Sequence, residues 1–190
     1  MPDSSVDTND ENYWPPGAIP RENLEPEVVL RPALGRFRAL LSQNWSPDTA
    51  YPGTLTHSDW FVGNPRGQCG VSSVWLAEVL AWEYSIDSTF CRGSLIFDEE
   101  TAEDLFDHCW LEISGRPGDG LILDLTCDQA QGVDRRIVFD AKAKLDRDGV
   151  HYVPREQVEI SDLPSNPVWP RYTRLLRNMV SPIQAPTVGR

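Results

Sequence analysis

The stretch GQCGVSSVWLAEVLAWEY, residues 67–84, decides the fold. Its apolar residues, from Val71 to Ala81, recur at helical spacing and cover most of the circumference, which predicts a mostly buried helix. The helix would begin at Cys69, so the thiol would lie at the positive end of the helix dipole. A helix buried on most sides must pack against other elements, and the rest of the chain has to supply them.

Two apolar runs downstream predict a β-hairpin. They are HCWLEI (residues 108–113) and LILDLT (residues 121–126), joined by the turn-rich SGRPGDG. In the register that pairs Ile113 with Leu121, Leu111 lies opposite Leu123 and Cys109 opposite Leu125, which gives one face to an apolar core. The other face would carry His108, Trp110, Asp124 and Thr126. His108 and Asp124 would then be diagonal neighbours whose side chains can meet.

The remaining segments complete one α+β domain. Helical periodicity predicts helices over residues 28–45 and 171–180, and short strands are expected at 136–139 and 150–153. Residues 46–67 are expected to form a long structured loop. We expect an acidic, proline-rich arm at residues 1–27, a single domain at 28–180 and a tail at 181–190. In this domain a central helix carrying Cys69 packs on an antiparallel sheet carrying His108 and Asp124.

Composition excludes several classes of function. The 190 residues, 40% of them hydrophobic, suit one globular domain, and the net charge of −12 would repel a nucleic acid. No apolar run is long enough to span a membrane, and no signal segment opens the chain, so a cytoplasmic protein with reduced cysteines is expected. An acidic surface would favour a cationic substrate, although acidity more commonly serves solubility. No cysteine pair has CxxC spacing, which weakens a zinc reading.

The chemistry indicated is that of a thiol nucleophile. A cysteine reacts as its thiolate, and both a helix N-terminus and a neighbouring imidazolium favour that form. Cys69 would be the nucleophile, His108 the general base, and Asp124 the group that orients the histidine. The expected reaction is acyl transfer from an amide or thioester carbonyl of a peptide, protein or small molecule. No metal and no cofactor are expected.

Such a reaction also needs donors for the oxyanion. The backbone N–H of Cys69 would supply one, and Gln68 or Asn64 a second from a side chain, with Gln68 favoured because it is nearer. Gly70 would permit close approach of the substrate. Trp110 would shield the imidazole from water or simply fill the edge of the core.

Four motifs resemble the YunG-like family of small bacterial proteins. They are NPRGQCGVS (64–72), HCW (108–110), DLTCDQ (124–129) and RYTRL (171–175), which are similar to the family's GQC, H-x-W, DLT-x-x-Q and R-Y-x-x-L patterns. Ala130 stands where the family often has an aromatic residue, and the N-terminal extension is longer. The resemblance implies a papain-like or transglutaminase-like fold, and it implies no substrate.

Other readings of these residues stay open. Cys69 could be a packed core thiol, the chain could be a non-catalytic binding protein that keeps a thiol-enzyme fold, or Cys69, His108 and Asp124 could bind a metal. His57 is an alternative base. The acidic run 98–107 is either a solvated face or a rim that selects amine-bearing substrates. Cys109 and Cys127 are expected to pack in the core or at the rim of the cleft, and Cys91 at the end of a connection.

Overall fold

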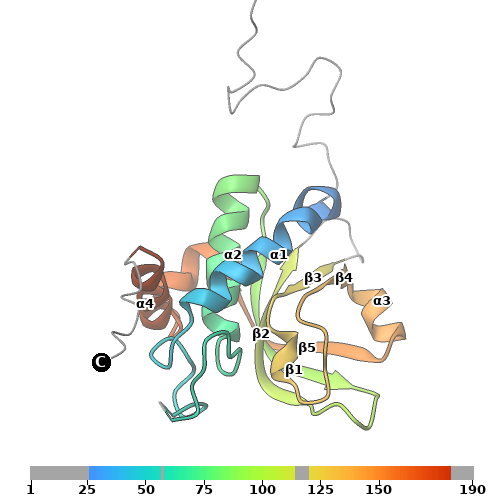
Figure 1. Ribbon diagram of the computed structural model, residues 1–190. Helices are drawn as coiled ribbons and strands as arrows, with labels where there is room; N and C mark the ends of the chain where they lie inside the picture. Colours follow the sequence, from blue (N-terminus) through green and yellow to red (C-terminus); the bar gives the residue numbers. More distant parts are fainter. Residues whose placement is uncertain (1–25, 57, 114–119, 181–190) are drawn as a thin grey trace, which may run out of the picture.

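A five-stranded antiparallel sheet is the centre of the computed structural model, which describes residues 26–56, 58–113 and 120–180 (Figure 1). The strand order is β4-β3-β2-β1-β5, so the sheet is open and β2 lies in its middle. The strands are β1 (Thr89–Phe97), β2 (Leu105–Ile113), β3 (Leu121–Asp124), β4 (Val138–Ala141) and β5 (Val150–Glu159). With helices packed on this sheet, the fold is α+β, as predicted.

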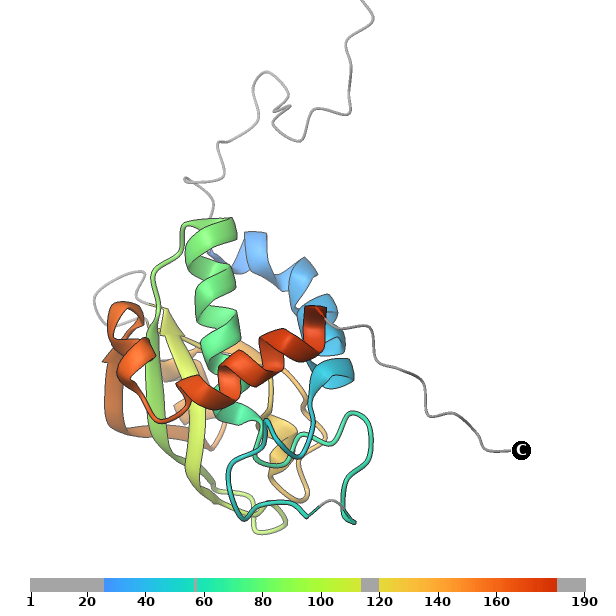
Figure 2. The same ribbon diagram turned by 90° about the vertical axis from the view of Figure 1, so that its left-hand side faces the viewer.

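Of the four α-helices in the described residues, three cover one face of the sheet. They are α1 (Pro26–Asn44), α2 (Cys69–Tyr84) and α4 (Trp169–Val180), whereas α3 (Lys142–Arg147) lies against the other face (Figure 1). Figure 2 shows α4 crossing beside α2 and reaching towards α1. Two short 3-10 helices, η2 (Cys127–Gln129) and η3 (Ile160–Ser165), complete the described elements.

Helix α2 forms the centre of the larger core. Val71, Val74, Ala77 and Leu80 have no accessible surface, and the helix packs on β2 and β1 as well as on α4. Because apolar residues cover most of its circumference, the helix can contact the sheet on one side and other helices on the rest. The helix begins at Cys69, as the sequence predicted.

The opposite face of the sheet holds a second, smaller core. It contains Trp110, Ile122, Leu145 and Tyr152, and Trp110 packs edge-on against the Tyr152 ring at a centroid distance of 5.1 Å. Strand β2 is therefore buried on both faces over residues 108–111.

The hairpin pairing is confirmed where the structure describes it. Leu111 lies opposite Leu123 and Ile113 opposite Leu121, while β3 ends at Asp124, before Leu125 could pair with Cys109. The first helix was predicted two residues short at its start, since α1 begins at Pro26. The connecting turn at residues 114–119 and most of the predicted arm and tail lie outside the described residues.

Strand β1 was missed by the sequence analysis. No strand was predicted for residues 89–97, yet β1 pairs with both β2 and β5 in the sheet. The acidic run 98–107 is a loop that becomes the first residues of β2, rather than a helix. No helix in the described part of the chain is long and apolar enough to cross a membrane.

Candidate active site

A sharp turn before α2 presents Cys69. Gly67 has a positive φ of 72°, and its carbonyl accepts a hydrogen bond of 2.8 Å from the Tyr51 backbone N–H. A Cβ at this position would lie 2.2 Å from Thr54 Oγ1 and 2.8 Å from Tyr51 N. Only glycine satisfies both the backbone conformation and the close approach. The turn therefore holds the start of α2 against the loop that carries Tyr51 and Thr54.

His108 and Asp124 form a buried pair on the neighbouring strands β2 and β3. The distance between His108 Nε2 and Asp124 Oδ2 is 2.7 Å, and each residue is 1% exposed. Asp124 Oδ1 accepts from the Thr126 backbone N–H at 2.7 Å and from its hydroxyl at 2.9 Å. The pair predicted from the hairpin register is therefore brought together.

Tyr152 is a further member of this arrangement that the sequence did not indicate. Its hydroxyl, on β5, donates to Asp124 Oδ2 at 2.9 Å, so four hydrogen bonds in all converge on the Asp124 carboxylate. A tyrosine in a short strand carries no signal of such a contact, because the pairing of β5 with β1 is a long-range feature.

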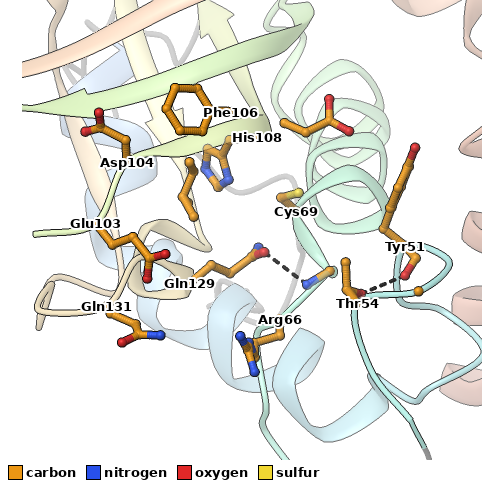
Figure 3. Close-up of a pocket in the computed structure, with 14 residues that line it drawn as sticks. Tyr51, Thr54, Arg66, Cys69, Glu103, Asp104, Phe106, His108, Gln129 and Gln131 are labelled. Carbon is orange, nitrogen blue, oxygen red and sulfur yellow. Dashed lines mark hydrogen bonds between the residues drawn. The ribbon is translucent and has the colours of Figure 1, made fainter.

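The second imidazole nitrogen of His108 is the one available for chemistry. Nδ1 is buried and makes no hydrogen bond to the described residues, and Figure 3 shows the ring facing the Cys69 sulfur. Trp110 stacks on His108 at a centroid distance of 6.4 Å and is fully buried. Trp110 thus lies behind the imidazole and does not line the pocket.

The electrostatics favour an ion pair between Cys69 and His108. Burial lowers the pKa of His108, but the Asp124 carboxylate and the Cys69 thiolate together raise it to about 10. Interaction with the Cys109 thiol lowers the pKa of Cys69 well below its ordinary value against the effect of burial, and His108 lowers it further. Burial would raise the pKa of Asp124, yet His108 and the Thr126 donors keep it low. All three shifts favour the charged forms: thiolate, imidazolium and carboxylate.

The four cysteines are free and buried, and they differ in their surroundings. Interaction with Cys69, together with burial, raises the pKa of Cys109 well above its usual value, so Cys109 is the protonated partner of the two. Cys91 and Cys127 belong to the smaller core on the other face of the sheet.

The two side chains expected to hold the oxyanion lie elsewhere. Gln68 is fully buried, with Oε1 accepting from Thr49 at 2.8 Å and Nε2 donating to the Ser46 carbonyl at 2.9 Å. Asn64 Oδ1 accepts from the Arg66 backbone N–H at 3.0 Å. Neither residue lines the pocket at Cys69. Both side chains make their hydrogen bonds to the segment that precedes α2.

Gln129, in η2, is the amide that the structure brings to the pocket instead. Its Oε1 accepts from the Gly67 backbone N–H at 3.0 Å, next to Cys69 (Figure 3). Its Nε2 is buried and has no hydrogen-bond partner among the described residues. A buried donor without a partner is costly and indicates a ligand or a functional role. The sequence contained this residue in the DLT-x-x-Q motif but gave no reason to prefer it over Gln68.

A buried arginine fixes the segment that carries Gln129. Arg38, from α1, pairs with Asp128 at 2.8 Å, donates to the Leu125 carbonyl and lies 4.4 Å from the centre of the Trp45 ring. Trp45 in turn donates to Ser72 of α2 at 3.0 Å. Helices α1 and α2 and the segment after β3 are thereby joined around the site.

A cavity of about 470 Å³ opens beside Cys69 and His108. The acidic run contributes one wall, with Glu103, Asp104 and Asp107. Gln131 lies beside Glu103, whose backbone N–H donates to the Gln131 carbonyl at 3.0 Å, and Arg66 lies across the pocket from Asp104 (Figure 3). Asp107 is already paired with Arg92, and Asp104 accepts from a backbone N–H of β1. Glu103 is therefore the acidic group with most freedom to meet a substrate.

Cys69, His108 and Asp124 lie in a row rather than around a common point where a metal ion could bind. Within the described residues, no three His, Cys, Asp or Glu side chains converge on one point, and His108 stands between Cys69 and Asp124. Gly70, the other predicted site residue, lies one residue into α2, and a Cβ there would contact Val168 at 3.0 Å. The alternative base His57 lies outside the described residues.

Comparison with protein-family models, with curated proteins and with solved structures finds no match in any of the three.

Proposed function

We propose that the chain is a thiol enzyme that transfers an acyl group from an amide or thioester through a covalent thioester on Cys69. The single observation that carries this proposal is the orientation of His108. Its Nε2 is held by a buried carboxylate at 2.7 Å, and its free Nδ1 faces a thiol at the first residue of a helix. A packed core cysteine needs none of these partners.

The first half-reaction uses the ion pair. The Cys69 thiolate attacks the carbonyl carbon, and the oxygen that becomes negative accepts hydrogen bonds from the Cys69 backbone N–H and from Gln129 Nε2. The first N–H groups of a helix have no partner within the helix, so the Cys69 donor is available. His108 Nδ1–H then gives its proton to the leaving amine or thiol as the bond to the carbonyl carbon breaks. A thioester and a neutral imidazole remain.

The second half-reaction reverses these roles. His108 Nδ1 takes a proton from water or from an amine as that nucleophile attacks the thioester, and the thiolate leaves. Water as the acceptor gives an amidase, peptidase or deamidase, and an amine gives an acyltransferase. Asp124 keeps Nδ1 directed at Cys69 throughout and stabilises the imidazolium.

The arrangement also supports a finer assignment of the fold. A nucleophilic cysteine at the start of a central helix, with its histidine and aspartate on neighbouring antiparallel strands, is the plan of papain-like and transglutaminase-like enzymes. We propose that this chain follows that plan, and that its likeness to the YunG-like family extends to the site. Gln129 and Arg171 lie in the motifs that carry the resemblance.

An activated ester tests the proposal directly. Incubation with p-nitrophenyl acetate should release nitrophenolate and leave one acetyl group on Cys69, detected by mass spectrometry of the intact protein and of its peptides. Cys69→Ala should abolish both signals, and Cys91→Ala, which removes an equally buried thiol, should leave both unchanged. An acetyl group distributed over several cysteines, or none at all, would favour the non-catalytic reading.

A further inference from the structure

A second cavity adjoins the first at Cys69. It is small, about 40 Å³, and Cys69 lines both this cavity and the larger one. Its walls come from the loop at Tyr51, the start of α2, strands β1 and β2, and the start of α4. A carbonyl group attacked by Cys69 therefore has two adjoining spaces for its substituents, a large one and a small one.

Two guanidinium groups border the small cavity. The Cζ atoms of Arg92 and Arg171 lie 5.9 Å and 5.3 Å from the centre of the Tyr51 ring. Arg92 is neutralised, because Asp107 accepts from it at 2.8 Å through both carboxylate oxygens. The charge of Arg92 is therefore already balanced by a counter-ion, and the question is whether that of Arg171 is too.

Arg171 has no such partner. Among the described residues, no carboxylate lies within salt-bridge distance of Arg171, and its guanidinium makes one hydrogen bond there, to the Thr49 carbonyl at 3.4 Å. Burial lowers the pKa of Arg171, against the effect of the neighbouring Cys69 and Cys109. A half-buried guanidinium without a fixed counter-ion loses hydration that a bound anion would restore.

The space between Arg171 and Cys69 is kept open by a glycine. A Cβ at Gly70 would lie 3.6 Å from Arg171 Nη2 and 3.8 Å from Cys109 Sγ. Gly70 lines the small cavity, and a side chain at this position would occupy space between the thiol and the guanidinium, which the glycine leaves open.

We propose that Arg171 binds a carboxylate of the substrate, which makes this a site for acyl compounds with an acid group next to the scissile bond. The small cavity has room for little more than that group, so the rest of the substrate occupies the larger pocket. This inference rests on the proposed function of Cys69. A free peptide C-terminus and a small organic acid present the same carboxylate, and the experiment separates them.

Two alkylating reagents of nearly equal size test the site. Iodoacetate and iodoacetamide both react by displacement of iodide by the thiolate, and they differ only in carboxylate against amide. In the wild-type protein at low ionic strength, iodoacetate should alkylate Cys69 about tenfold faster than iodoacetamide and show saturation with concentration, because a charge-assisted hydrogen bond holds it before reaction. A free thiolate shows no such preference, because its negative charge repels the anionic reagent.

Two variants on α4 distinguish binding of a carboxylate by Arg171 from a general effect of positive charge. Arg171→Met should remove the preference for iodoacetate and leave the iodoacetamide rate within about twofold. Arg174→Met removes the same charge from an exposed position one turn further along α4, and it should keep the preference. Equal slowing of both reagents by Arg171→Met would overturn the proposal, since Arg171 would then only support the thiolate.

Protection experiments on the wild-type chain need no variant. Propionate, but not propionamide, should slow iodoacetamide labelling of Cys69, and glycylglycine should do so better than its C-terminal amide if peptide ends are the ligand. Protection by propionate alone would assign small acids. Failure of every carboxylate to protect overturns the inference while leaving the thiol enzyme intact, whereas an unreactive Cys69 would remove both proposals.

Discussion

The two cores of this molecule each hold two buried cysteines, and of these four thiols only Cys69, in the larger core, has a lowered pKa. In the smaller core, burial and the charge of Glu112 raise the pKa of Cys91 to about 12, and burial and Asp124 raise that of Cys127 further. In the larger core, Cys69 is as deeply buried and yet its pKa is lowered. Burial alone therefore does not decide the state of a thiol here; the partners at the start of α2 do.

Removal of His108 should reduce the difference in reactivity between Cys69 and the other cysteines more than any other change. In His108→Ala, the rate of Cys69 alkylation by iodoacetamide near pH 6 should fall by about a hundredfold, because the loss of an imidazolium partner raises a thiol pKa by roughly two units. Alkylation near pH 9 should persist. Partial alkylation followed by peptide mapping measures all four cysteines in one sample.

The matched control is His151→Ala. His151 lies near the surface, and Asp98 and Asp146 accept hydrogen bonds from it at 3.2 Å and 3.1 Å. Unlike His108, it does not line the pocket at Cys69. This variant should leave Cys69 labelling unchanged. Equal effects of the two substitutions would mean that histidine does not act on Cys69.

Substitution of Gln129 should separate thiolate formation from oxyanion binding. Gln129→Ala should lower the rate of acylation by p-nitrophenyl acetate by about 10²-fold, which is typical for loss of one oxyanion donor. Alkylation by iodoacetamide forms no oxyanion, so its rate should change little. Gln131→Ala, an exposed amide in the same pocket, should lower neither rate, and a similar loss in both variants would count against the donor role.

The surroundings of the thiols also differ in their backbone. Gly67, two residues before Cys69, has a left-handed conformation, and no described residue so close to Cys91 or Cys127 does. Gly67→Ala should lower the free energy of unfolding by at least about 1–2 kcal/mol, because a side chain here is strained and meets Thr54. Gly35→Ala, in the exposed interior of α1 with open space around it, should raise stability by about 0.5–1 kcal/mol. Urea denaturation of both variants checks the contrast, which would fail if Gly67→Ala were neutral.

Tyr152 should give the smallest effect, because it contacts Asp124 and acts on His108 only through that carboxylate. Tyr152→Phe removes one of four hydrogen bonds to the carboxylate, and acylation should slow by less than about tenfold. Tyr172→Phe removes a hydroxyl from the other core and serves as the control. A fall in Tyr152→Phe as large as that in His108→Ala would show that Tyr152 takes part in the chemistry itself.

Local sequence patterns predicted the elements that carry the site. The apolar periodicity after Cys69 fixed the start of α2, and the alternation in residues 108–113 and 121–126 predicted the register that joins His108 to Asp124. Both are short-range signals, since a helix period or a hairpin is encoded within about twenty residues.

Contacts between distant segments could not be predicted in this way. Strand β1 was missed because Gly93 and the polar residues Arg92 and Ser94 interrupt its alternation, although β5 pairs along its whole length. Gln129 and Arg171 reach the site from two segments that no local pattern relates to Cys69. Gln68 was favoured only for its closeness in sequence, and its side chain turns into the loop instead.

The most direct test of the central claim is the rate of Cys69 alkylation by iodoacetamide as a function of pH in the wild-type protein, from about pH 4 to about pH 10. We predict that Cys69 reacts at a rate that is already near its plateau at neutral pH, with a midpoint clearly below the roughly 8.5 of a free thiol, while Cys91 and Cys127 stay unreactive. The acid limb should report protonation of the thiolate. An alkaline change should follow near pH 10, where the His108 imidazolium loses its proton. A Cys69 midpoint at or above that of an ordinary thiol would contradict the ion pair, and with it the thiol-enzyme account.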